Sequence, residues 1–420
     1  MSPRLAIDGG ERAVKTPLPP MFPGGMRIGI EEERAVLNVL RSKRLFRYYG
    51  PAPGLSQTDL FEQEFAAHMG AAYALAVSSG TAALMCAMAG LGIGPGDEVI
   101  VPAYTWIATA SAAVALGAVP VIAEIDESLT LDPADVERKI TPYTRAIVAV
   151  HMRGSPCQMD LLTDVAKRHG VALIEDTAQA TGASFHGKRL GTWGDAGAFS
   201  LQFNKIITSG EGGVLITNDH ALYKRAIMCH DVVGGQRHHI PPDEIIAGIN
   251  FRMSELQAAV ALAQLGKLEG ILADMRRNHA AIAERIADRV RASGSAFRRL
   301  NDPAGDAGLA LVLLLPTAER ARWAVEALRA EGVGAMALYH PDIEDYHIYC
   351  YWAPIMNRKT WSEQGDPWRW ASRAIAYTRD MCPRSLDLLS RSVRIDVSPD
   401  LSESQVEEVS DALKKVLEAL

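Results

Sequence analysis

Short apolar runs alternate with stretches of helical periodicity through the middle of the chain. The runs are rich in β-branched residues, which favour strands, and they lie at 98–101, 119–122, 146–150, 171–174 and 214–217. Apolar residues recur at helical spacing over 81–91, 105–116 and 161–169. This alternation predicts a mostly parallel sheet with helices on both faces. In such sheets ligands bind at the carboxyl ends of the strands.

The two ends of the chain have different patterns. The first 30 residues are rich in glycine and proline and predict an extended arm, followed later by a loop at 46–56. Outside the alternating region we expect a strand at 309–315 and helices at 30–40, 60–69, 254–268, 272–290, 318–331 and 402–420. These patterns predict an N-terminal arm (1–30), a large domain (31–265) and a small C-terminal domain (266–420).

Composition narrows the class of protein. The chain has 420 residues, 48% hydrophobic and 22% charged, which is enough for two globular domains. A formal net charge of −7 argues against nucleic acid or an anionic membrane as the main partner. Two uncharged stretches, 69–96 and 101–123, are long enough to span a bilayer, but they contain Gly, Ser, Thr or Pro at intervals that suit turns. We expect both to form the core of the α/β domain, and the N-terminus lacks the apolar stretch of a signal peptide.

The cysteines and histidines do not predict a metal site or a disulfide framework. Five cysteines are scattered along the chain without a CxxC pair, which is typical of free thiols in a reducing compartment such as the cytoplasm. His238 and His239 are adjacent, an arrangement that rarely places both rings on one ion. We expect them to face substrate or solvent, and we predict no bound metal.

Lys205 is the most informative candidate for chemistry. It lies between an apolar run at 196–201 and the glycine-rich stretch 210–213. A second apolar run, 214–217, follows. This pattern places an amine at a strand end, beside backbone that can approach a ligand closely. Such a lysine can form a Schiff base with a carbonyl compound, although a solvated surface lysine is the alternative when the residue is considered alone.

Three further segments follow predicted strands or begin predicted helices. Ser79-Gly80-Thr81 at a helix start can bind a phosphate, or Ser79 can simply cap the helix. Asp176 follows the strand at 171–174 and can pair with a protonated pyridine nitrogen, or cap a helix. An aromatic residue in the segment 102–106 can stack on a flat ring, or belong to the core. Together with Lys205, these are the parts that a pyridoxal phosphate (PLP) enzyme needs.

The chain resembles the DegT/DnrJ/EryC1/StrS sugar aminotransferase family over nearly its whole length. The resemblance rests on Ser79-Gly80-Thr81, Glu175-Asp176, Ser200 with Lys205 five residues later, the stretch 210–213, and Gly248-Ile-Asn250-Phe-Arg252-Met-Ser-Glu255. It implies the aspartate-aminotransferase fold. This fold has a large domain with a mostly parallel seven-stranded sheet and a smaller C-terminal α/β domain. The resemblance also implies pyridoxal 5'-phosphate as cofactor and a homodimer with shared active sites.

The resemblance implies a role for each matching residue. Lys205 would hold the cofactor and move protons, and Asp176 would pair with its pyridine nitrogen. The other implied cofactor contacts are Gln179 near the phenolic oxygen, Trp106 stacked on the ring, Gly80, Thr81 and Ser200 at the phosphate, and Asn250 at the phosphate of the neighbouring subunit. The implied reaction is amino transfer from glutamine or glutamate to a ketone in two half-reactions.

Several readings of the function stay open at this point. Gln202 is similar to members that act on cyclitol ketones, which favours an aminocyclitol or amino sugar made for an antibiotic or another natural product. The alternatives are a nucleotide keto-sugar acceptor, dehydration or aromatisation of a cyclic substrate, and a non-catalytic protein with the PLP fold. Retention of Lys205 favours transamination, because dehydratase relatives carry histidine there. An NAD enzyme is disfavoured since no GxGxxG motif opens a strand-to-helix turn.

Overall fold

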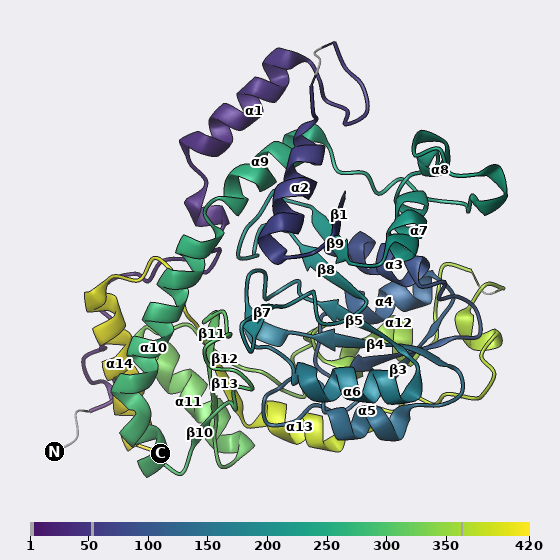
Figure 1. The fold of residues 1–420 in the computed structure, drawn as a ribbon. Helices are drawn as coiled ribbons and strands as arrows, with labels where there is room; N and C mark the ends of the chain where they lie inside the picture. Colours follow the sequence, from purple (N-terminus) through teal and green to yellow (C-terminus); the bar gives the residue numbers. More distant parts are fainter. Residues whose placement is uncertain (1–3, 52–53, 363) are drawn as a thin grey trace.

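The computed structural model describes residues 4–51, 54–362 and 364–420 (Figure 1). Its large sheet contains β1 (Tyr73–Val77), β2 (Glu98–Pro102), β3 (Val119–Ala123), β4 (Thr144–Val150), β5 (Ala172–Asp176), β8 (Ala196–Ser200) and β9 (Gly213–Thr217). The strand order is β1-β9-β8-β5-β4-β2-β3, and only β9 runs antiparallel to its neighbours. The prediction of a mostly parallel seven-stranded sheet is confirmed. All five predicted strands of this region are present.

Helices cover both faces of this sheet, and the strands alternate their side chains between two cores. On β2, Val99 and Val101 belong to one core and Ile100 to the other, as the period of two requires. The first core packs against α3 (Gly80–Gly90), α4 (Ala108–Ala115) and α7 (His220–His230). The second packs against α2 (Gln57–Met69), α5 (Pro133–Lys139), α6 (Met159–His169) and α9 (Glu255–Leu265).

The two uncharged stretches lie inside these cores, as predicted. Residues 69–96 contain β1 and α3, and residues 101–123 contain α4, β3 and the end of β2. Within the described residues, no helix is both long and apolar enough to cross a membrane.

The small sheet belongs to the C-terminal part of the chain. It consists of β10 (Ala296–Phe297), β11 (Ala310–Leu314), β13 (Ser392–Asp396) and β12 (Ala335–Ala337), in that order and all antiparallel. Its core packs against α11 (Ala318–Glu331), α14 (Glu403–Glu418) and the second half of α10 (Leu268–Ala292). The first half of α10 packs in the large domain, so this helix joins the two cores (Figure 1). The domain boundary at 265/266 stays a prediction.

The remaining short elements complete the fold. They are α1 (Ile30–Ser42), the hairpin β6 (Ser184–Phe185) and β7 (Lys188–Arg189), α8 (Gly234–Arg237), α12 (Ala353–Met356) and α13 (Pro383–Ser390), together with 3-10 helices at Ala6–Asp8, Gly25–Arg27, Met152–Gly154, Pro242–Glu244, Tyr349–Tyr351 and Pro367–Arg369. The predicted loop at 46–56 contains no helix or strand in its described part; residues 52 and 53 lie outside the described residues.

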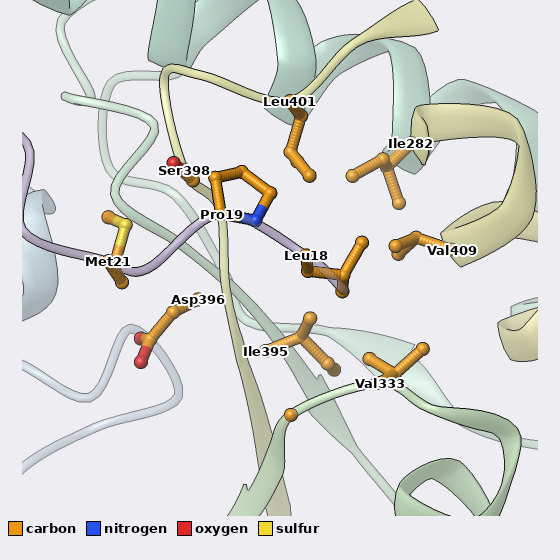
Figure 2. Close-up of a pocket in the computed structure, with 11 residues that line it drawn as sticks. Leu18, Pro19, Met21, Ile282, Val333, Ile395, Asp396, Ser398, Leu401 and Val409 are labelled. Atoms are coloured by element: carbon orange, nitrogen blue, oxygen red, sulfur yellow. The ribbon is translucent and has the colours of Figure 1, made fainter. Parts of the chain in front are cut away.

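The N-terminal arm packs against the small domain. Leu5 and Val14 are buried in the small-domain core. The two carboxylate oxygens of Glu331 accept the N–H groups of Ala6 and Ala13, each at 2.8 Å. Further along, the arm forms part of the wall of a cavity of about 280 Å³ (Figure 2), with Leu18, Pro19, Met21, Ile282, Val333, Gly334, Ile395, Asp396, Ser398, Leu401 and Val409 around it.

One predicted helix begins later than expected, and the reason bears on the site. Helical periodicity starts at residue 105, but α4 starts at Ala108. The N–H groups of Thr105 and Ile107 instead donate to the carbonyl oxygens of His347 and Tyr346, at 2.8 and 3.0 Å. This pairing with a distant segment keeps residues 105–107 out of the helix, and it places Trp106 beside His347.

Candidate functional site

A cavity of about 490 Å³ opens at the carboxyl ends of β5 and β8 and the N-terminus of α3. This is the edge of the sheet where open α/β folds bind ligands. Its lining residues are Ser79, Gly80, Thr81, Leu84, Thr105, Trp106, Ala108, Val150, Asp176, Ala178, Gln179, Ser200, Gln202, Asn204, Lys205, Glu211 and His347. All the predicted site residues except Asn250 therefore meet in one place.

Asp176 is the last residue of β5, and its carboxylate is oriented from two sides. Thr109 donates its hydroxyl to Oδ2 at 2.8 Å, and the backbone N–H of Ala178 donates to Oδ1 at 3.2 Å. Thr105 in turn hydrogen-bonds the Thr109 hydroxyl at 2.8 Å. Burial raises the pKa of Asp176, while these hydrogen bonds and the positive charge of Lys205 oppose that rise. The site therefore favours a positive partner beside this carboxylate.

Lys205 lies in the loop between β8 and β9. Its N–H donates to the carbonyl oxygen of Gln202 at 3.0 Å, and its own carbonyl accepts from Gly24 of the arm at 3.3 Å. Burial lowers the pKa of the Lys205 amine, and the nearby Asp176 carboxylate opposes this shift. A lowered pKa increases the share of neutral amine, which is the nucleophilic and basic form.

The start of α3 forms a cradle for an anion. Ser79 caps the helix by accepting the Ala82 N–H at 3.1 Å, so the N-cap alternative is correct for this residue. Gly80 and Thr81 follow at the first turn, where backbone N–H groups point outward and the helix dipole is positive. A Cβ at Gly80 would lie only 2.8 Å from the Cβ of Ser200, so only glycine allows this close approach of helix and strand.

Polar and aromatic side chains form the remaining walls. Trp106 is 47% exposed and lines the cavity. Its ring centroid lies 5.0 Å from that of His347, whose Nδ1 is 2.7 Å from the Asp345 carboxylate. Gln179 is oriented by the N–H of Arg153, which donates to its Oε1 at 3.1 Å. This half of the cavity offers several hydrogen-bonding groups to a polar ligand.

Sequence reasoning missed His347 and Asp345. The sequence signal for His347 is weak: the residue lies in a segment, 346–370, that is rich in Tyr and Trp. His347 reaches the cavity because residues 103–107 pair with residues 346–349 through backbone hydrogen bonds. A contact between segments more than 200 residues apart leaves no periodic trace in a single sequence.

Asn250 is exposed and does not line the cavity of its own chain. Its Oδ1 accepts the N–H of Arg252 at 3.2 Å. The role implied for it, at the phosphate of a neighbouring subunit, stays a prediction. His238 and His239 directly follow α8, and neither residue lines the cavity.

Comparison with known proteins agrees with this geometry. The family model described as "DegT/DnrJ/EryC1/StrS aminotransferase family" matches residues 27–360. The chain belongs to this family. It is 42% identical over 297 residues to the L-glutamine:2-deoxy-scyllo-inosose aminotransferase of Streptomyces kanamyceticus, covering 68% of each chain. It is 44% identical over 220 residues to the GDP-perosamine synthase of Caulobacter vibrioides, covering 52% of this chain and 58% of that protein.

Among solved structures, the chain is similar to 3-amino-5-hydroxybenzoic acid synthase. The TM-score is 0.79 at 29% sequence identity, and the match covers 97% of this chain and 100% of that chain. The resemblance inferred from sequence motifs is thereby confirmed, as are the fold and the assignment to PLP-dependent aminotransferases.

The cofactor of this DegT/DnrJ/EryC1/StrS family member is pyridoxal 5'-phosphate. The cavity fits this molecule in three places. The first turn of α3 at Gly80 suits a phosphate, the Asp176 carboxylate suits a protonated ring nitrogen, and the Lys205 amine suits an aldehyde. The space that a Cβ at Gly80 would fill is kept open beside Ser200.

Proposed function

We propose that the protein transfers an amino group from glutamine or glutamate to a keto group of a cyclitol or sugar, in the biosynthesis of an amino sugar or aminocyclitol natural product. The observation that carries this proposal is the single cavity that joins Lys205, Asp176 and the start of α3 to a polar wall. The wall matches a hydroxylated substrate better than an apolar one. The 42% identity to an aminotransferase of 2-deoxy-scyllo-inosose supports the cyclitol class.

Lys205 and Asp176 have different roles in this reaction. When bound, the cofactor supplies an aldehyde and a ring that accepts an electron pair. Lys205 Nζ would hold the cofactor through its aldehyde. Once the donor amine displaces it, the lysine would move the proton from the donor carbon to the cofactor, and in the acceptor half-reaction it would move a proton from the cofactor to the acceptor carbon. Asp176 holds the proton on the ring nitrogen, because its carboxylate is kept in place by Thr109.

The other proposed contacts position the cofactor. Gly80, Thr81 and Ser200 bind its phosphate at the start of α3, Trp106 stacks on its ring, and Gln179 lies near its phenolic oxygen. Three of these five residues, Ser200, Trp106 and Gln179, come from the sheet edge or from loops after strands, and Gly80 and Thr81 begin α3, so rigid elements hold them. Exclusion of bulk water strengthens each polar contact made there.

A nucleotide keto-sugar is the second candidate acceptor. The 44% identity to a GDP-perosamine synthase favours it. Dehydration or aromatisation of a cyclic substrate is a third reading, which retention of Lys205 disfavours, since transamination requires a base here that moves a proton between the substrate carbon and the cofactor.

We propose a homodimer as the working form, with Asn250 reaching the partner's phosphate site. Exposed large apolar side chains in and next to α1 support an association surface, namely Met26, Ile28, Ile30, Leu37, Leu40 and Leu45. α1 lies at the edge of the molecule and packs on α9 (Figure 1). Light scattering should give twice the mass of 45.4 kDa. The five cysteines are all free, which agrees with the cytoplasm as the proposed compartment.

Mass spectrometry of the products tests the proposed function. The PLP-loaded protein is incubated with glutamine or glutamate and a panel of keto-cyclitols and nucleotide keto-sugars. We expect an amine on a cyclitol, formed by the wild type and by Lys414→Ala, a control at a partly exposed lysine of α14 outside the cavity lining, but not by Lys205→Ala. Amination of nucleotide sugars alone would support the second candidate. Loss of water or aromatisation without amination would contradict the proposal.

A further inference from the structure

We infer that His347 is a specificity-determining residue of the acceptor half-reaction, where its Nε2 accepts a hydrogen bond from a hydroxyl group of the ring ketone, and that Asp345 positions it. The inference rests on the proposed function and deepens it. It assigns one wall of the cavity to the acceptor and leaves the amino donor to other groups.

The first observation is the orientation of the imidazole. Asp345 Oδ1 lies 2.7 Å from His347 Nδ1 and also accepts the backbone N–H of His347 at 2.9 Å. A carboxylate only accepts, so Nδ1 carries the hydrogen. The lone pair of a neutral ring is then on Nε2, for which the described residues provide no hydrogen-bond partner.

The second observation is the position of the ring. His347 lines the same cavity as Lys205 and Asp176, and its side chain is 20% exposed. It packs beside Trp106 at 5.0 Å between ring centroids and is farther from Tyr104, at 6.5 Å. An acceptor nitrogen next to an aromatic face is a suitable site for a polyhydroxylated ring, which presents both C–H faces and O–H groups.

The third observation is the rigidity of the backbone that carries the pair. Thr105 donates its N–H to the carbonyl of His347 at 2.8 Å, and Tyr104 and Ile348 form an antiparallel bridge. The indole N–H of Trp352, a fully buried side chain, donates to the carbonyl of Tyr346 at 2.8 Å. The segment is therefore fixed against the large domain, so the imidazole is held in place before substrate arrives.

The charge state of the His347 imidazole favours the ketone acceptor over the amino donor as its binding partner. Burial lowers the pKa of His347 and the positive charge of Arg153 acts in the same direction, whereas the hydrogen bond to Asp345 opposes the shift. A neutral imidazole gives no charge attraction to the carboxylate of glutamine or glutamate. It suits an uncharged hydroxyl, which donates one hydrogen bond.

The experiment separates the two half-reactions of the holoenzyme. Conversion of the bound cofactor by glutamine is followed by absorbance, and amination of 2-deoxy-scyllo-inosose by the amine form is followed by mass spectrometry. We expect His347→Phe to lower kcat/KM for the ketone by about 10- to 100-fold, the loss typical of an unpaired polar group, while the glutamine step is nearly unchanged. His347→Gln keeps an acceptor atom and should retain part of the activity.

Two further measurements complete the test. Asp345→Ala should reduce the ketone step less than His347→Phe does, because the ring remains but is no longer oriented. Calorimetry with scyllo-inositol, a hydroxylated ring without a ketone, should show weaker binding to His347→Phe than to the wild type. His169→Phe, the same exchange at an exposed position of α6, is the matched control and should behave as the wild type.

The outcomes distinguish this inference from the proposed function. Equal losses in both half-reactions, an unchanged ketone step, or equal scyllo-inositol binding by both proteins would overturn the role of His347. A wild-type enzyme that aminates none of the hydroxylated ketones contradicts the proposed function itself, and the inference falls with it.

Discussion

Two neighbouring carboxylates at the end of β5 lie on opposite faces of the sheet. Glu175 points toward the core that contains α6, and Asp176 toward the core that contains α4. Glu175 is fully buried and accepts three backbone N–H groups at 2.7–2.9 Å, those of Gly191, Trp193 and Gly194. It also lies 3.1 Å from the buried ring nitrogen of His151.

The difference between them separates a structural charge from a functional one. The hydrogen-bonding capacity of Glu175 is met by groups of the protein itself, which fixes the loop after β7 against the sheet. Among the described residues, Asp176 accepts two hydrogen bonds, and it faces the cavity that contains Lys205. Its remaining acceptor capacity is available to a ligand. A buried carboxylate whose hydrogen-bonding capacity is not fully used by the protein indicates function more strongly than one whose capacity is fully used.

Removing the functional carboxylate should have the largest effect. In Asp176→Ala the proton on the ring nitrogen of the cofactor loses its partner, so we expect the glutamine half-reaction to slow by about 10³-fold, comparable to the loss of one electrostatic group in other active sites. Single-turnover absorbance measurements give this rate. A loss below tenfold, with cofactor binding intact, would show that Asp176 does not hold this proton.

The structural carboxylate should show the opposite profile. Glu175→Gln places an amide among three N–H donors and should lower the free energy of unfolding by about 3 kcal/mol, as for other broken buried charge networks. Urea denaturation measures this value. Activity per folded molecule should fall far less than in Asp176→Ala. If Glu175→Gln were as stable as the wild type but inactive, Glu175 would have a functional role and the comparison with Asp176 would be wrong.

Much of this contrast was predictable from the sequence, and part of it was not. The apolar runs and the residues after them placed Asp176, Lys205 and the start of α3 at one sheet edge, because parallel strands bring their carboxyl ends together. The same pattern cannot separate Glu175 from Asp176 in role. That distinction depends on residues 191–194, which approach β5 only through the tertiary fold.

The small domain and the late segment at 345–352 were harder to predict. β12 and β10 have three and two residues, too short for a period-two pattern. The tract at 349–352 is apolar and aromatic, and its buried rings join the core on the α4 side of the large sheet, which also includes Ala310, Val312 and Leu314 of β11. Propensity describes local structure, and so it does not indicate which of two cores will bury a short apolar segment.

The hydroxyl that orients the functional carboxylate gives a finer test of the comparison. Thr109→Val removes the 2.8 Å hydrogen bond to Asp176 with little change in volume. A hydrogen bond to a charged group contributes about 1.5–3 kcal/mol, so we expect roughly a tenfold or greater loss in the glutamine half-reaction. Thr105→Val acts one hydrogen bond further away and should lose less. Equal losses in the two variants would point to general disturbance of α4.

The smallest expected effect is the gain in stability when the charge of the functional carboxylate is removed. Burial raises the pKa of Asp176 in the cofactor-free protein, so the folded state binds this proton more tightly than the unfolded chain does. The resulting stability is present below the unfolded pKa of about 4 and is lost as the pH rises through the folded value.

At neutral pH the charged carboxylate therefore lowers the free energy of unfolding, and Asp176→Asn should raise this free energy by about 1 kcal/mol. The gain should shrink as the pH falls toward 4. Denaturation of the cofactor-free proteins across this pH range measures both values, and a destabilised Asp176→Asn at neutral pH would show that Asp176, like Glu175, belongs to the structural network.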